Sequence, residues 1–240
     1  NCNELAAGKS YFQLGDNEIS PNNELIAYST DTVSRRKYDI YFKDLKTNKV
    51  YEETIPNTTG SITWANDNKT IFYTKQDEET LRSYRIMKHV LGTPVGDDVI
   101  VFEEKNEEFD TYVFKTKSEK YIVIGSSSTL TDEFQLLNAD TPNGDFKLFA
   151  PRTKGLEYEI NHKGNEFYIF QQLIAEATHQ PNAQGECPRI QKDFLLHLIQ
   201  SIQARPECQD HSKPYSQIYD DCENRKSCIE TPNQFGTKRR

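Results

Sequence analysis

The sequence has 240 residues, of which 35% are hydrophobic, and it carries a net charge of −8. No apolar run approaches the roughly 18 residues of a membrane-spanning helix, so we expect no membrane segment. The acidic balance argues against nucleic-acid binding, because neutralising phosphates requires clustered Lys and Arg.

The composition changes near residue 170, where two different kinds of sequence meet. Residues 1–170 hold all 8 Val and 11 of the 13 Tyr, and their charges sum to −8. Residues 171–240 hold no Val, 10 Gln and four of the five Cys, and their charges sum to zero. Because Val and Tyr favour strands, only the first part is predicted to form β-sheet.

In chain order, the first part repeats one plan, which is a short strand, a polar turn and an alternating strand. The plan occurs at four places: 19–29, 63–74, 114–125 and 160–170. The centres of the four turns are Asn23, Asn68, Glu119 and Gly164, and successive centres are 45, 51 and 45 residues apart. Such a period indicates a repeat architecture.

Two further strands follow each complete pair. The third strands are predicted at 38–45, 81–89 and 132–138, and the fourth strands at 49–55, 98–104 and 145–151. Four strands in about 45 residues are typical of one β-propeller blade. We therefore predict an all-β fold, with three complete blades and the opening of a fourth over residues 15–170.

Residues 171–240 contain no such repeat. Apolar residues on one helical face predict a helix at 189–204, and residues 205–240 are interpreted as loop or disorder. The tail also holds Cys and His residues whose spacing matches no common zinc module: Cys187, His197, Cys208, His211, Cys222 and Cys228. We interpret the cysteines as unpaired, and a disulfide frame or a metal site are the less favoured alternatives.

No motif identifies a catalytic, cofactor-binding or metal-binding residue, so we assign none and expect no cofactor. The sequence has no Gly-x-Ser-x-Gly nucleophile motif, and Gly8-Lys9-Ser10 lacks the leading Gly of a phosphate-binding loop. The glycosylation triplets at Asn57 and Asn68 lie at turns and receive no function.

Three other features have both a structural and a functional interpretation. The acidic stretch 103–108 is interpreted as a solvated loop rather than a cation-binding patch. Arg35-Arg36 could bind a carboxylate, although a surface role is at least as favoured. Trp64 is predicted to pack between blades rather than to form a platform for a ligand.

The repeats carry a more specific pattern in these stretches: 11–15 (YFQLG), 19–28 (ISPNNELIAY), 31–38 (DTVSRRKY), 59–67 (TGSITWAND), 81–93 (LRSYRIMKHVLGT), 119–126 (EKYIVIGS) and 149–158 (FAPRTKGLEY). Together they resemble the opening of the propeller in oligopeptidase B-like serine peptidases of the prolyl oligopeptidase family. The resemblance runs from Glu4 to Phe170, which is about 70% of the chain.

In that family a seven-bladed propeller caps an α/β-hydrolase domain that supplies a Ser–Asp–His triad. The resemblance implies hydrolysis of short peptides, after Arg or Lys in this branch, with the propeller excluding folded proteins. It implies that residues 1–14 enter from the catalytic-domain side, that 15–170 form part of a seven-bladed β-propeller, and that 171–240 diverge. No triad residue carries over, so we expect the chain to be inactive alone and to need the missing hydrolase domain as partner. A cytoplasmic location is expected from the family alone.

The alternative function is a stand-alone propeller-repeat binding module, with the tail as a partner-binding helix. The abrupt change at 170–171 also suggests a reading-frame shift or a misjoined gene, which the nucleotide sequence in the other two frames would test. Because an incomplete ring leaves sheet edges and apolar faces uncovered, we expect poor solubility, marginal stability or self-association.

Overall fold

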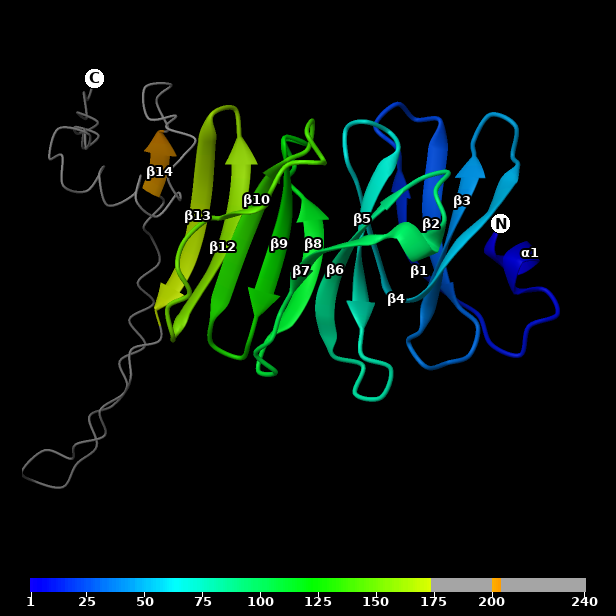
Figure 1. The fold of residues 1–240 in the computed structure, drawn as a ribbon, viewed down its shortest axis with the longest axis horizontal. Coiled ribbons are helices and arrows are strands. Elements are labelled where there is room, and N and C mark those ends of the chain that lie inside the picture. The colour runs from blue at the N-terminus through cyan, green and yellow to red at the C-terminus, as the bar shows by residue number, and fades with distance from the viewer. Residues whose placement is uncertain (174–199, 204–240) are drawn as a thin grey trace, which may run out of the picture.

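The structure is a computed structural model that describes residues 1–173 and 200–203. After a short helix, α1 (Cys2–Ala6), it consists of antiparallel sheets that stand side by side (Figure 1). This arrangement confirms the predicted all-β fold and its partial β-propeller. Among the described residues, no helix is long and apolar enough to cross a membrane.

The strands follow one another as neighbours, in four successive blades. The first blade holds β1 (Gln13–Ile19), β2 (Leu25–Asp31), β3 (Tyr38–Asp44) and the first half of β4 (Val50–Trp64). The second holds the rest of β4 with β5 (Thr70–Gln76), β6 (Ser83–Val90), a 3₁₀ turn at Val95–Asp97 and β7 (Val99–Glu103). The third holds β8 (Asp110–Lys115), β9 (Tyr121–Ser127), β10 (Asp132–Asn138) and β11 (Lys147–Leu148). The fourth holds β12 (Leu156–Lys163), β13 (Glu166–Leu173) and β14 (Gln200–Gln203).

The four predicted turn centres are confirmed by their backbone angles. Asn23, Asn68, Glu119 and Gly164 all lie in the left-handed region, with φ of 61°, 60°, 58° and 65°. Gly and Asn tolerate this region best, and a single such residue lets a tight turn match the twist of the strands it joins. The repeat therefore reflects a backbone requirement that recurs once in each blade.

Strand β4 differs from the prediction, because one strand replaces the two that the pattern indicated. Thr58 pairs with Tyr38 of β3 and also with Lys75 of β5, so the first two blades share a single seven-stranded sheet. The chain bends there through Asn57 and Gly60, at φ of 56° and 95°. A Cβ atom at Gly60 would come within 2.9 Å of the Tyr38 ring, so this close approach requires glycine.

The core is divided among the blade interfaces, with one apolar cluster in each. The cluster between the first two blades includes Phe42, Trp64 and Tyr73, and two further clusters lie between the second and third blades and between the third and fourth. Each cluster draws residues from two neighbouring blades. A blade is therefore stabilised mainly by its neighbours, as in other repeat architectures.

Two further predictions need correction. The predicted strand at 145–151 is reduced to β11, which has only two residues. The predicted helix at 189–204 is wrong at Gln200–Gln203, where β14 pairs antiparallel with β13. The exposed edge of β13 offers unpaired backbone groups, and satisfying them can override a local helical pattern. The remainder of that helix and the tail cysteines lie outside the described residues.

Candidate functional site: a charged hollow between inner strands

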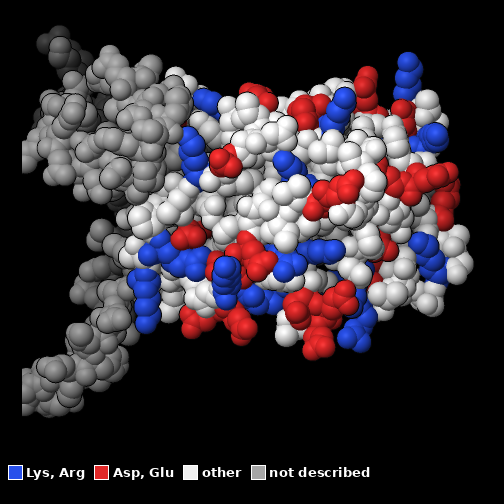
Figure 2. Space-filling model, viewed as in Figure 1, with Lys and Arg blue, Asp and Glu red and all other residues white. Residues whose placement is uncertain are grey.

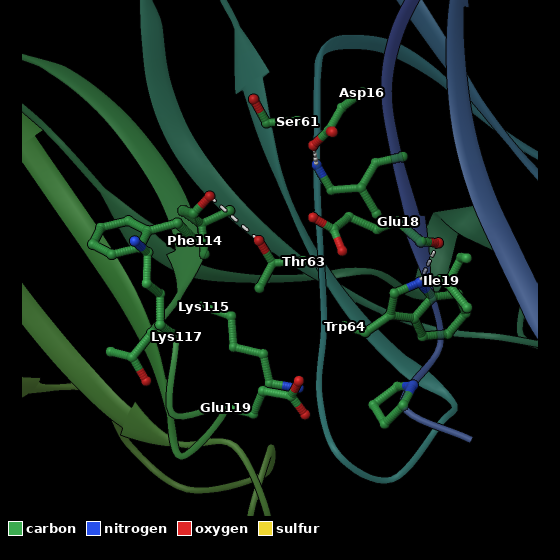
Figure 3. A pocket seen from close by; sticks show the side chains of 14 residues that line it. Asp16, Glu18, Ile19, Ser61, Thr63, Trp64, Phe114, Lys115, Lys117 and Glu119 are labelled. Carbon is green, nitrogen blue, oxygen red and sulfur yellow. Dashed lines mark hydrogen bonds between the residues drawn. The ribbon is translucent and has the colours of Figure 1, made fainter. Parts of the chain in front are cut away.

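The first strand of each of the first three blades contributes to a hollow of about 370 Å³. β1, the second half of β4 and β8 lie next to one another and form its walls (Figure 3). In a closed propeller the first strand of each blade faces the central axis, so the hollow lies on the side of these blades that would face the channel. Its lining is rich in charged and hydroxyl side chains.

The β1 wall is acidic. Asp16 and Glu18 both lie on this strand, and both line the hollow. Asp16 accepts a hydrogen bond from the backbone N–H of Ile62 on β4, at 3.1 Å. Partial burial raises the pKa of Glu18, the charge of Asp16 raises it further, and Lys115 opposes both effects. Glu18 is thus a carboxylate held in an unfavourable position.

The β8 wall is basic. It presents Lys115 and, just beyond the strand, Lys117, with Glu119 at the turn centre below them (Figure 3). Burial lowers the pKa of Lys115, while the charges of Glu119, Glu18 and Asp140 act in the opposite direction. Both charged walls therefore lose part of their hydration.

Hydrogen bonds between the blades fix the walls relative to one another. Trp64 Nε1 donates to the backbone carbonyl of Glu18 at 3.0 Å, and Thr63 Oγ1 donates to that of Val113 at 3.3 Å. Trp64 is only 3% exposed and its ring lies edge-on to Phe42, which confirms the packing role predicted for it. The hollow is consequently a rigid feature of the inner strands.

A second polar cluster, the His89 cluster, is buried at the interface of the first two blades. His89 Nδ1 lies 2.6 Å from Asp98, and its Nε2 lies 2.7 Å from Glu53. Tyr73 donates to the other oxygen of Asp98 at 2.8 Å. Burial by itself lowers the pKa of His89, but Asp98 and Glu53 outweigh it and raise the pKa. The geometry is that of a buried imidazolium between two carboxylates, and it joins β4 to β6 and the turn before β7.

The acidic stretch 103–108 is not wholly a solvated loop: that interpretation is wrong for Glu104, which is buried, and Glu103 is exposed but ends strand β7. Glu104 is 6% exposed and accepts from Arg152 at 2.6 Å, and Arg152 also contacts Glu133 and covers the Phe109 ring at 3.8 Å. Glu103 pairs with Arg85 at 2.6 Å. A charge run can thus contain buried partners that local composition does not reveal.

The other candidates from the sequence lie apart from the hollow. Arg35 and Arg36 are exposed on a loop whose backbone N–H groups bond to the carboxylate of Asp31. Gly8-Lys9-Ser10 lies between α1 and β1, whereas a phosphate loop follows a strand and opens a helix. In the described part of the chain, no group of three or more His, Cys, Asp or Glu could hold a metal ion.

The face drawn in Figure 2 carries Lys and Arg interspersed with Asp and Glu, so it has no extended surface of one sign. The sequence predicted Trp64 for packing and Glu119 for a turn, but it did not identify the charged residues of the hollow as a site, although a signal was present. Glu18 and Thr63 occupy the same place in the repeat, five residues before their turn centres, and Trp64 and Lys115 share the next place. Aligning the repeats by their turn centres would have placed these side chains on neighbouring inner strands.

Comparison with known proteins gives consistent results. Residues 1–179 match the family described as the prolyl oligopeptidase N-terminal β-propeller domain. Dipeptidyl aminopeptidase BI of Pseudoxanthomonas mexicana is 40% identical over 167 residues, which are 70% of this chain and 23% of that protein. Protease 2 of Moraxella lacunata is 31% identical over 169 residues, again 70% of this chain and 24% of that protein.

A solved structure shows the same fold at a similar identity. Oligopeptidase B from Leishmania major has a TM-score of 0.68 and 29% identity, over 71% of this chain and 24% of that one. The chain thus spans about a quarter of the length of the relatives that it matches.

Proposed function

Since this chain belongs to the prolyl oligopeptidase family, as part of that family's N-terminal β-propeller domain, we propose that it gates substrate entry in a serine-type oligopeptidase. The whole enzyme would hydrolyse short peptides, after Arg or Lys, as the likeness to oligopeptidase B suggests. The partners of the chain are then its peptide substrates and a hydrolase domain.

The observation that carries this proposal is the charged hollow on the inner strands. Its walls are joined by hydrogen bonds from one blade to the next, so the inner strands are held at fixed positions relative to one another. In a closed ring, rigid inner strands of this kind would surround a narrow central channel that passes an extended peptide and excludes a folded domain. Selection by size is therefore the role that the geometry supports best.

We also propose that the chain alone has no peptidase activity. A serine hydrolase of this class needs its nucleophile on a sharp turn in a Gly-x-Ser-x-Gly motif, and this sequence contains none. Turnover of a short Arg-containing peptide by the purified chain would contradict this part of the proposal.

A chimeric enzyme tests the gating role. Residues 1–170 would replace the matching segment of the Pseudoxanthomonas relative, and the unmodified relative would serve as the control. We expect the chimera to cleave a short peptide and to leave a folded protein with accessible Arg residues intact. Equal cleavage of both substrates by a folded chimera would overturn the gating role.

A further inference from the structure

The two charged walls of the hollow face each other across a gap. Asp16 and Glu18 project from β1, Lys115 and Lys117 come from β8 and the turn after it, and hydroxyl groups of β4 lie between (Figure 3). Among the described residues, the ion pairs within 4 Å do not include any of these side chains. Glu119 also lines the hollow and is the carboxylate that acts most strongly on Lys115, so the positive charge of the β8 wall is partly compensated without forming a close ion pair.

We propose, on the basis of the gating function above, that this hollow binds short peptides in their zwitterionic form. The free ammonium group of the peptide contacts the Glu18 side, and its free carboxylate contacts the Lys115 side. The hollow then recognises the two ends of a short peptide rather than its side chains.

Electrostatics favour such a ligand over either charge alone. Glu18 is partly desolvated beside Asp16, and Lys115 is partly desolvated on the opposite wall. An ammonium group relieves the repulsion between the two carboxylates, and a carboxylate compensates the lost hydration of the lysine. Charge-assisted hydrogen bonds of this kind are shorter and stronger than neutral ones. A lone cation would pair only with the carboxylates of the β1 wall, and a lone anion only with the lysines of the β8 wall.

Of the two carboxylates, Glu18 is the one free to bind a ligand. Asp16 already accepts from the backbone N–H groups of Asn17 and Ile62, at 2.8 and 3.1 Å. These bonds hold Asp16 in place as a fixed negative charge. We therefore assign the direct contact with the ammonium group to Glu18 and a supporting role to Asp16.

The size of the hollow agrees with a small peptide. Its volume of about 370 Å³ lies near the lower end of the range of roughly 300–1,000 Å³ that is usual for small-molecule sites. The hydroxyl groups of Ser61 and Thr63 also line the hollow, with Thr63 nearer to the charged side chains (Figure 3). Ser61 can donate to or accept from the amide of a dipeptide in the hollow, whereas Thr63, whose hydroxyl already donates to the Val113 carbonyl, can only accept.

The test uses the full 240-residue chain and the dipeptide Arg-Ala, followed by ligand-observed NMR. Two capped forms of the same dipeptide provide the comparison: one has an acetylated amino end, and the other has an amidated carboxyl end. We expect the free dipeptide to bind with a Kd on the order of millimolar, and each cap to weaken binding roughly tenfold, the loss of one charge-assisted contact. Equal binding of free and capped peptides, or no binding of the free one, would overturn the proposal.

Variants assign each end of the peptide to one wall. Glu18→Gln should weaken binding of the free dipeptide roughly tenfold and leave the acetylated form unchanged. Lys115→Met should likewise weaken binding of the free dipeptide roughly tenfold and leave binding of the amidated form unchanged. Glu52→Gln and Lys46→Met, which alter exposed charges outside the hollow, serve as matched controls. An unchanged Trp64 emission spectrum verifies that each variant is folded.

The outcome is separable from that of the gating proposal. If Arg-Ala does not bind but the chimera still spares folded proteins, the zwitterion site is refuted and gating by size stands. If the chimera cleaves folded proteins while the charge-dependent binding is observed, the gating role is refuted and the site stands as a binding feature of the inner strands.

Discussion

Replacing His89 with Leu should destabilise the interface of the first two blades. His89 is fully buried, and the two carboxylates that it contacts come from different elements, Glu53 from β4 and Asp98 from the turn before β7. Leu fills a similar volume without donating a hydrogen bond. The change therefore removes the positive charge and leaves two carboxylates close together in the interior.

The expected loss is about 3 kcal/mol in the free energy of unfolding, the lower end of the 3–5 kcal/mol that breaking a buried ion pair costs. The side chain of Asp98 is 2% exposed and that of Glu53 is 15% exposed, so water compensates little of the lost pairing. In His89→Leu each carboxylate keeps one hydrogen-bond donor, so the expected loss of stability stays near the lower limit. Tyr73 still donates to Asp98, and the backbone N–H of Gly92 still donates to Glu53.

The same cluster predicts how stability depends on pH. The folded pKa of His89 lies above its unfolded value of about 6.5. The contribution of this group is complete below pH ~6.5 and is lost as the pH rises through the higher folded pKa. Between these limits the wild-type chain should lose stability with rising pH, whereas His89→Leu should lack this component.

Urea unfolding followed by Trp64 fluorescence measures both effects. The chain has one Trp, which is buried in the apolar cluster of the same interface, so the signal reports on this site. Glu52→Gln, an exposed neighbour of Glu53, is the control and should stay within about 0.5 kcal/mol of the wild type. A loss below about 1 kcal/mol for His89→Leu, or an identical pH profile, would refute the buried-imidazolium reasoning.

Three other predictions concern packing. Arg152→Ala should cost about 2–4 kcal/mol by leaving Glu104 buried without its partner, and a thermal midpoint equal to that of the wild type by circular dichroism would contradict this. Gly125→Ala should cost about 1–3 kcal/mol, because the new Cβ would lie 2.7 Å from Cε2 of Tyr112; an unchanged urea midpoint would show that the ring moves freely. The purified chain should self-associate, because the first and last blades leave apolar groups such as Phe170 uncovered, and light scattering should therefore give a mass above 27.8 kDa. A soluble monomer with a sharp thermal transition would contradict this prediction.

The sequence by itself determined the class of fold, because the evidence for it is local. Alternating strands, and turn centres such as Asn23 and Gly164 that tolerate left-handed angles, repeat at a period typical of propeller blades. The family resemblance rests on the same stretches. The packing role of Trp64 also followed from its position next to a strand end in the repeat.

Only the tertiary structure decided which charges are buried and what they face. Glu104 lies in a run of acidic residues that looks solvated, yet its partner Arg152 is 48 residues away. Glu18 and Lys115 lie on different blades, nearly a hundred residues apart, and they share a hollow only because the inner strands stand side by side. Likewise, Gln200–Gln203 form a strand because they pair with the edge of β13, although the local sequence pattern predicts a helix. Burial and long-range pairing depend on how blades stack, and a pattern read along one strand does not contain that information.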